Sequence, residues 1–474
     1  MIFTSAFFCE VLGVTFAAYY LPALRRWQPL ILVAASLVIY WKVARPSVAL
    51  LICSAAFIGA VTHWVAQPDG ARRRRLAMLG VAVTLLILGF YKYRYLLIPG
   101  LAASEPAQRT GLLDSFLYAA LPAGISFYTF HGISLIVDTY RDPKTIGGPR
   151  PLAGHLVRSF LYITFFPQLV AGPIVKGKAF FPQIVPKRLA GIDWRASLDC
   201  LICGYFLKLV LADNLQHFTQ PMTDPGILQI AGSFQLFAMM IAYSAQIFAD
   251  FAGYSLIAIG TAKLFGYDLP QNFNNPYLSA SFAEFWRRWH MSLSAWLRDY
   301  LYIPLGGNRR GALRTYANLF IVMLLGGLWH GADWKYAAWG VWHGAALMAE
   351  RALSHVLPAL PEGRAVRLLR ALFVFAYVTF GWLLFKLDSF GTVVAYLERM
   401  AQGVPAEGVV ERTDTEVMLI VAALALVYQI ASEWLRDRPA SGWLRELRPM
   451  ALGAMLVLIL FGQGEENAFI YFQF

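Results

Sequence analysis

Three histidines lie in parts of the sequence where apolar side chains would be expected. His330 lies in ANLFIVMLLGGLWHG, His343 in WGVWHG, and His290 in FWRRWHMSLS. An ionisable residue is costly to hold in an apolar membrane segment, so its presence there indicates a functional site. A neutral imidazole can take a proton from a hydroxyl near neutral pH, and burial favours that neutral form. Gly331 and Gly344 leave room for a ligand or a close helix, and the alternative is that all three histidines are hydrogen-bonded core residues.

The other five histidines are expected to be structural. His63, His155, His217 and His355 lie near the ends of apolar segments or in loops, where an interfacial or structural role is the simplest interpretation. His131 lies inside the apolar run FYTFHGISL and is either a buried hydrogen-bonded group or part of a substrate pathway.

Several other kinds of chemistry are not expected. The sequence contains no H-E-x-x-H, no phosphate-binding G-x-x-x-x-G-K-[ST] and no G-x-S-x-G. His330 and His343 have no cysteine or carboxylate nearby except Asp333, so we expect no metal. Cys200 and Cys203 form a C-x-x-C inside an apolar segment without a second pair, which favours packed thiols.

The composition predicts an all-α, polytopic integral membrane protein. Of the 474 residues, 58% are hydrophobic and only 14% are charged, whereas a soluble domain has roughly 25% charged residues. The net charge of +12 comes from basic residues clustered in short loops, a pattern of membrane topology and not of nucleic-acid binding. The N-terminus lacks the features of a cleaved signal peptide, so its first segment is expected to be a retained span.

About eleven transmembrane helices are expected within a single domain over 1–474, together with re-entrant and interfacial helices. Basic residues place the loops around 25–26, 72–75 and 436–448, and the long stretch 141–188, in the cytoplasm. The acidic loop 387–416 is then external, as are both termini, and 156–172 cannot be a simple crossing. The apolar segments are 5–23, 28–44, 46–66, 76–98, 113–137, 156–172, 197–215, 228–262 (one tilted span or a broken pair), 315–330, 336–350, 368–386, 417–433 and 449–463.

The stretch 268–314 differs from the apolar segments. Ser281 with Glu284 three residues later predicts a capping box that opens a helix. We expect a cytoplasmic interfacial helix followed by a flexible basic loop, GGNRRG. The apolar stripe of this helix comprises Phe282, Trp286, Trp289, Leu293 and Trp296, with Arg287, Arg288 and Arg298 off the stripe.

The two histidine motifs together resemble those of the membrane-bound O-acyltransferase family. The similarity is carried by FNNPYLSASFAEFWRRWHMSLSAWLRDYLYIPLGGNRRG and NLFIVMLLGGLWHGADWKYAAWGVWHG. FFPQLVAGPIVK and the terminal FIYFQF are similar to the family's alginate O-acetyltransferase branch. The resemblance covers essentially the whole chain and implies helices arranged around a central funnel.

The resemblance also implies roles for individual residues. His330 matches the family's catalytic histidine and His290 its second site position. Candidates for lining the substrate tunnel are His343, Trp329, Trp286, Asn274 and Asn275. Arginines that would suit an anionic donor are Arg287, Arg288, Arg309 and Arg310, although anchoring to anionic lipid explains the same charges.

The function implied is transfer of an acetyl group from a cytoplasmic donor, acetyl-CoA, across the bacterial inner membrane to an exported polysaccharide such as alginate. No bound cofactor is expected, and a periplasmic serine-hydrolase-like partner would complete the transfer. The alternatives are another transfer of the same family, such as D-alanine to teichoic acid or an acyl group to lipid, and a non-enzymatic transporter. The polysaccharide, the identity of the donor, the exact number of spans, the oligomeric state, and whether His330 is a base or an acetyl carrier stay open.

Overall fold

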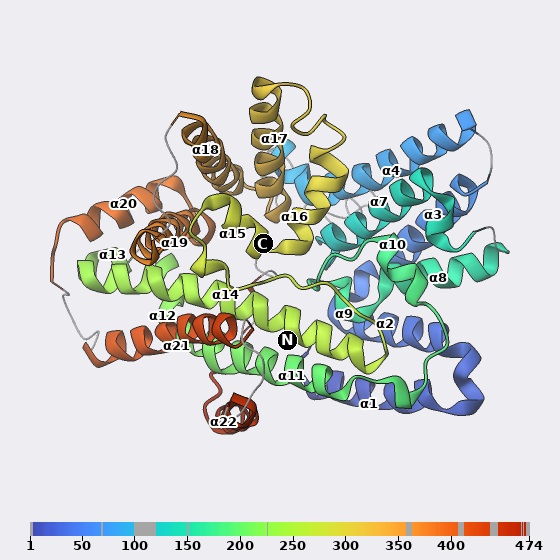
Figure 1. The fold of residues 1–474 in the computed structure, drawn as a ribbon, viewed down its shortest axis with the longest axis horizontal. Helices are drawn as coiled ribbons and strands as arrows, with labels where there is room; N and C mark the ends of the chain where they lie inside the picture. The colour runs from blue at the N-terminus through green and yellow to red at the C-terminus, as the bar shows by residue number, and fades with distance from the viewer. Residues whose placement is uncertain are drawn as a thin grey trace, which may run out of the picture. The chain divides into compact units, whose positions relative to one another are not determined.

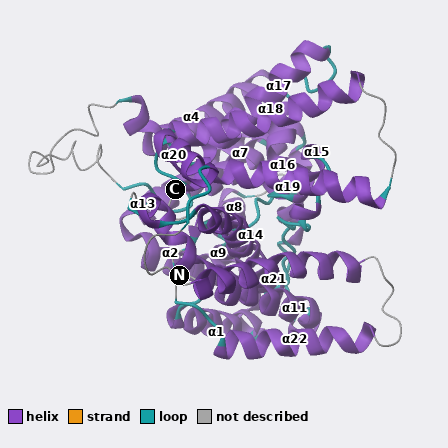
Figure 2. Cartoon of the chain, turned by 90° about the vertical axis from the view of Figure 1, so that its left-hand side faces the viewer, coloured by secondary structure: helices purple, strands orange, loops and turns teal. Residues whose placement is uncertain are grey.

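The computed structural model describes residues 3–67, 70–98, 120–148, 151–224, 226–356, 363–405, 412–436, 444–465, 467 and 469–470. Within these residues the chain is helical and has no strand, as Figure 2 shows. A helix satisfies its own backbone groups, which is why long apolar runs fold this way in a membrane. The all-α prediction is therefore confirmed for the described residues. In the part of the chain that the structure describes, six helical stretches are long and apolar enough to cross a membrane: Pro22–Val65, Gly70–Leu97, Ser233–Leu264, Ala312–His330, Arg364–Lys386 and Asp414–Leu435.

The chain divides into two compact units, which does not test the prediction of one functional domain. Unit 1 comprises Met1–Leu198 and Ile257–Pro270. In it α3 packs against α4, α7 and α8, and α2 packs against α1 and α8 (Figure 1). Its helices are α1 (Ala6–Tyr20), α2 (Gln28–Ala44), α3 (Val48–Val65), α4 (Gly70–Leu97), α7 (Ile125–Arg141), α8 (Leu152–Thr164), α9 (Phe166–Leu169), α10 (Gly177–Phe180), the start of α11 (Trp194–Tyr205) and the end of α14 (Ser233–Leu264).

Unit 2 comprises Asp199–Leu256 and Gln271–Phe474 and contains the three histidines of interest. Within it α17 packs along α18, and α18 also contacts α15 and α19. Two π-helical turns, Phe206–Ala212 and Arg298–Tyr302, interrupt its α-helices. Besides parts of α11 and α14 its helices are α12 (Asp213–Thr219), α13 (Ile227–Ile230), α15 (Phe282–Arg288), α16 (Met291–Leu297), α17 (Ala312–His330), α18 (Trp334–Val356), α19 (Arg364–Lys386), α20 (Phe390–Ala401), α21 (Arg412–Arg436) and α22 (Leu444–Phe461).

The structure resolves several sequence predictions. Residues 233–262 of the long segment 228–262 lie in one unbroken helix, α14, which contains no proline. Residues 228–230 belong to the short helix α13, and 231–232 between the two helices are not helical. The segment 156–172 is not a simple crossing, since α8 ends at Thr164, three residues before Pro167. The loop 387–416 contains α20, which begins after Ser389, whose hydroxyl accepts from the backbone N–H of Thr392. Residues 113–119 of the predicted segment 113–137 and most of the terminal FIYFQF lie outside the described residues.

Candidate functional site

The predicted interfacial helix of 268–314 is wrong in one respect: it is two short helices, α15 and α16, and not one. The predicted cap is present, because Ser281 Oγ accepts from the backbone N–H of Glu284 at 3.0 Å and Glu284 Oε2 accepts from that of Ala280 at 2.9 Å. The helix then breaks at His290, whose φ of +40° and ψ of +52° are left-handed. This conformation is rare for a residue with a side chain and occurs mostly where surrounding structure enforces it.

Hydrogen bonds to the preceding segment enforce the break on both sides of His290. The backbone N–H of Asn274 donates to the carbonyl of Arg288 at 2.9 Å, and that of Met291 donates to the carbonyl of Asn272 at 2.9 Å. Ser292 Oγ donates to Asn272 Oδ1 at 2.5 Å. The apolar stripe predicted from Phe282 to Trp296 therefore does not continue across the break. The side chain of His290 at the break is fully buried.

A close approach of two helices positions His330 and His343. His330 is the last residue of α17, and His343 lies in the middle of α18. Gly327 and Gly340 allow the approach, because a Cβ on Gly327 would lie 2.2 Å from the carbonyl oxygen of Tyr336 and 2.9 Å from Cα of Gly340. Added Cβ atoms at positions 331 and 344 would meet the ring of Tyr336 and the side chain of Met323, so these glycines also serve helix packing.

The three histidines lie within one aromatic cluster. The ring centroids of His290 and His330 are 6.4 Å apart, and Trp329 contacts both rings, at 5.8 and 5.0 Å. Trp339 lies 5.1 Å from His330 and 4.7 Å from His343. The exposed fractions of the three histidines are 0%, 5% and 0%. The structure thus brings together histidines that are up to 53 positions apart in the sequence.

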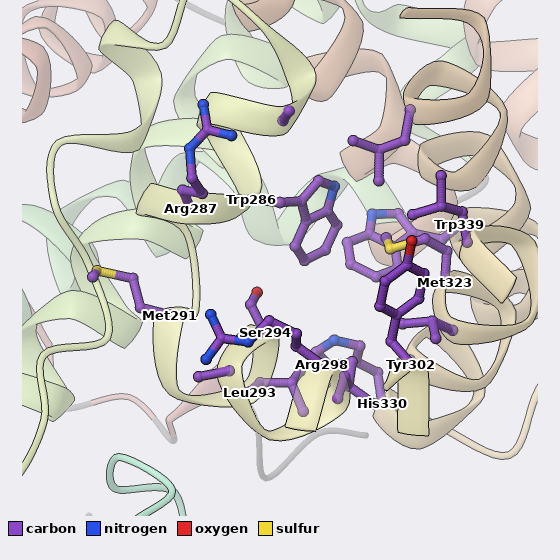
Figure 3. Close-up of a pocket in the computed structure, with 17 residues that line it drawn as sticks. Trp286, Arg287, Met291, Leu293, Ser294, Arg298, Tyr302, Met323, His330 and Trp339 are labelled. Atoms are coloured by element: carbon purple, nitrogen blue, oxygen red, sulfur yellow. The ribbon is translucent and has the colours of Figure 1, made fainter. Parts of the chain in front are cut away.

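A cavity of about 470 Å³ adjoins this cluster (Figure 3). It extends from Arg298, whose side chain is 63% exposed, to the buried His330. In Figure 3 the guanidinium groups of Arg287 and Arg298 lie toward one side of the cavity, with Trp339 on the other. Its lining residues are Ala283, Trp286, Arg287, Met291, Leu293, Ser294, Ala295, Leu297, Arg298, Tyr302, Leu319, Val322, Met323, Gly326, His330, Trp339 and Leu347.

Three of the residues predicted from the sequence line this cavity: His330, Trp286 and Arg287. His290, Trp329 and His343 are buried beside them without lining it. Neither ring nitrogen of His343 has a hydrogen-bond partner among the described residues.

The remaining predicted residues lie elsewhere. Arg288 forms ion pairs with Glu284 at 2.9 Å and Glu433 at 3.2 Å. Asn275 Nδ2 donates to the same Glu433 at 2.8 Å, and the backbone of Asn274 bonds to that of Arg288. Arg309 and Arg310 are exposed in the loop before α17 and do not line the cavity.

Sequence reasoning missed four lining residues that carry polar atoms: Ser294, Arg298, Tyr302 and Trp339. The first three were detectable, because they recur every four residues and so share one helical face. Arg298 donates to Asp299 Oδ1 at 2.8 Å and still borders the cavity. Trp339 follows the motif histidine at 330 by nine positions and carried no signal of its own.

The electrostatics favour a neutral base next to a cationic entrance. His290 lies outside the candidate membrane spans, and burial lowers its pKa to about 3, so its ring is neutral at pH 7. Arg287 and Arg298 place positive charge where the cavity opens. Such an arrangement can bind an anionic group at the arginines while an attached neutral group reaches His330. Among the described residues no group of three histidine, cysteine, aspartate or glutamate side chains could hold a metal.

Comparison with known proteins gives a consistent result. The model of the "MBOAT, membrane-bound O-acyltransferase family" matches residues 154–392. The chain is 36% identical to the Azotobacter vinelandii protein named "Probable alginate O-acetylase AlgI", over 82% of this chain and 76% of that protein. It is 33% identical to the peptidoglycan O-acetyltransferase of Helicobacter pylori, over 84% and 79% of the two chains. Identity to the teichoic acid D-alanyltransferase of Streptococcus thermophilus is 31%, over 56% and 68%.

Proposed function

Because the chain belongs to the membrane-bound O-acyltransferase family, and is therefore a membrane O-acyltransferase, we propose that it transfers an acetyl group from acetyl-CoA toward an exported polysaccharide such as alginate. The observation that carries this proposal is the cavity that joins two arginines to His330. An acyl donor with a phosphate-bearing end and a neutral thioester end would match this cavity, with its phosphates at the arginines and its thioester near His330. Relatives named for alginate and peptidoglycan O-acetylation support acetyl as the group that is moved.

His330 is the proposed reacting residue, in one of two roles. As a general base it takes the proton of an acceptor hydroxyl while that oxygen attacks the thioester carbonyl and the CoA thiolate leaves. As a carrier its ring nitrogen forms a bond to the acetyl carbon while the CoA thiolate leaves. The oxygen of the acceptor hydroxyl then displaces the imidazole, and the hydroxyl proton passes to the freed ring nitrogen. His290, 6.4 Å away between ring centroids, would assist as a second neutral imidazole.

The donor site proposed from the structure differs from the one predicted from the sequence. Arg287 and Arg298 border the cavity, whereas Arg288 is held by two carboxylates. Guanidinium groups bind phosphate with two parallel hydrogen bonds, which suits the phosphates of CoA. We therefore assign donor recognition to Arg287 and Arg298 and not to Arg288, Arg309 or Arg310.

The remaining parts of the proposal concern the membrane. We propose that the protein lies in the bacterial inner membrane, with about eleven spans around a central funnel and with periplasmic termini. The donor would enter from the cytoplasm. A periplasmic serine-hydrolase-like partner that receives the acetyl group is also part of the proposal. The positive residues beside the cavity support the cytoplasmic assignment, because cytoplasmic loops are enriched in lysine and arginine.

The test uses sealed membrane vesicles that contain the wild type or His330→Ala at matched protein levels, together with the periplasmic partner and the polysaccharide. Labelled acetyl-CoA is supplied on the cytoplasmic face, and O-acetyl ester is measured on the other face. The expected result is label on the polysaccharide with the wild type alone. Equal label with both proteins would remove the proposed role of His330.

Transfer of a D-alanyl group is the second candidate, supported by the similarity to a teichoic acid D-alanyltransferase. The same vesicles separate the two, if D-alanine attached to its carrier protein replaces acetyl-CoA. Transfer of D-alanine without transfer of acetyl would select this candidate. Movement of polysaccharide without any acyl donor would instead favour a transporter.

A further inference from the structure

The described residues that follow α22, which are 462–465, 467 and 469–470, form what we call the C-terminal strap. It runs along the π-helical turn Phe206–Ala212, where the backbone N–H of Gly464 donates to the carbonyl of Leu209 at 2.9 Å. Asn214 Nδ2 donates to the carbonyl of Gly462 at 2.9 Å. A Cβ on Gly464 would lie 2.6 Å from the backbone nitrogen of Asn214, so only glycine allows this close approach. The path of the strap is thus fixed by backbone contacts.

A buried cluster of three charges holds the next part of the strap. Lys208 Nζ lies 2.6 Å from Asp213 Oδ1 and 2.8 Å from Asp250 Oδ1, and all three side chains are at most 4% exposed. The cluster also bonds to the strap itself: Lys208 Nζ donates to the carbonyl of Asn467 at 3.3 Å, and the backbone N–H of Ile470 donates to Asp250 Oδ2 at 2.7 Å. Burying charged side chains costs free energy. Because two of these three buried charges also form hydrogen bonds to the strap, we interpret the cluster as holding the strap in position.

Aromatic contacts connect the strap to the histidine cluster. The ring of Phe469 stacks on Tyr254, with centroids 4.4 Å apart and an interplanar angle of 20°. Phe469 also contacts Phe251, at 5.9 Å. Phe251 in turn lies edge-on to His290, with centroids 4.7 Å apart. Phe251 and His290 are both 0% exposed, so displacement of one ring forces the other to move.

We propose that the Lys208–Asp213–Asp250 cluster and the C-terminal strap are a positioning device for His290, acting through Phe469 and Phe251. Backbone hydrogen bonds hold the left-handed conformation of His290, and the strap adds support from the side of its ring, through Phe251. None of these residues lines the cavity, so the device sets the position of the histidine and not the binding of the donor. Its consequence for acetyl transfer rests on the proposed function.

The experiment removes the aromatic contact without disturbing the buried charges. Phe469→Ala deletes the ring that touches Phe251, and Phe469→Tyr retains a ring of the same size. Phe461→Ala is the matched control, because Phe461 ends α22 just before the strap and is 85% exposed. Each protein is treated with diethyl pyrocarbonate, and modification of His290 is measured by peptide mass spectrometry, with the fully buried His343 as the reference for intact folding. The rate of acetyl transfer at saturating donor is measured in parallel.

In the wild type, in Phe469→Tyr and in Phe461→Ala we expect both histidines to be protected. In Phe469→Ala we expect His290 to be modified at least about tenfold faster while His343 stays protected, and transfer to fall about 10–100-fold, as for a group displaced by about 1 Å. Unchanged protection of His290 overturns the inference, and so does equal exposure of His290 and His343, which shows general unfolding. If His290 alone becomes exposed in Phe469→Ala, but the wild type transfers no acetyl group, the positioning role is supported and only the proposed function is refuted.

Discussion

Buried histidines occur in both units of the molecule, but their surroundings differ. In unit 1, His155 Nε2 lies 2.9 Å from Thr62 Oγ1 and 3.3 Å from Ser159 Oγ, and His131 Nε2 accepts from the backbone N–H of Val175 at 3.3 Å. In unit 2, aromatic rings surround His290 and His330: Trp329 lies against His290 and Trp339 against His330, which lines a cavity.

The difference teaches how burial should be interpreted. When the ring nitrogen of a buried histidine forms a short hydrogen bond to a fixed protein group, that bond sets the tautomer, and the nitrogen is not available to a ligand. A histidine whose ring lies in an aromatic wall beside a cavity is placed where a ligand could reach it, and under the proposed function the wall would exclude water that competes for an acyl group. The first kind should therefore matter for stability and the second kind for transfer.

The largest effect is expected at His330. His330→Ala should lower acetyl transfer by about 10²–10⁴-fold, the range for loss of a catalytic acid or base. The protein should remain in the membrane, because the packing loses only one ring. Transfer is measured in vesicles at matched protein levels, and His217→Ala, at an exposed position, is the control. Transfer near the wild-type rate would place His330 with the structural histidines.

His155→Ala should produce the opposite result. Loss of a buried hydrogen-bonded side chain should lower the free energy of unfolding by about 1–3 kcal/mol, because Ser159 loses its partner and a space is left beside Thr62. The midpoint of unfolding in detergent is measured together with transfer per folded molecule. Transfer per folded molecule should not change. If transfer falls while the unfolding midpoint is preserved, the division between the two kinds of histidine is wrong.

The sequence predicted the helical class and named three histidines that the structure brings together, but it did not predict how they are supported. The cap at Ser281 is local, so three residues were enough to recognise it. The break at His290 depends on backbone bonds from Asn272 and Asn274, and a calculation of helical periodicity assumes that no such break occurs. Burial of His155 depends on α3, about ninety positions away, so its place near the end of an apolar segment could not reveal it.

The pH dependence of stability should distinguish His290 from exposed histidines. Burial lowers the pKa of His290 from 6.5 to about 3, so between these values the unfolded chain binds a proton that the folded chain does not. The neutral ring of His290 therefore contributes fully to the free energy of unfolding above pH 6.5. Below that pH the contribution falls by about 1.4 kcal/mol per pH unit, so that about 2 kcal/mol is lost at pH 5. His290→Gln should show less loss of stability than the wild type between pH 7 and pH 5, as measured by chemical unfolding.

The control for that measurement is His217→Gln, at an exposed position of α12. It shows how replacing an exposed histidine by glutamine changes the measured stability over the same range. If the curve of His290→Gln is parallel to that of the wild type, the ring of His290 is hydrated in the membrane-bound protein, and the contrast drawn above no longer holds for His290.

The smallest effect tests the neighbouring arginines, which the sequence could not separate. Arg287 lines the cavity, whereas Arg288 is paired with Glu284 and with Glu433, a residue about 145 positions away. Arg287→Gln should raise the KM for acetyl-CoA about 3–10-fold, since an exposed charge pair contributes roughly 1 kcal/mol, and the effect should decrease at high salt. Arg288→Gln should leave this KM unchanged and lower the unfolding midpoint, because the ion pairs of Arg288 with Glu284 and Glu433 are lost. A raised KM in Arg288→Gln with normal stability would mean that the donor reaches the other face of α15, so that the cavity described above is not the donor site.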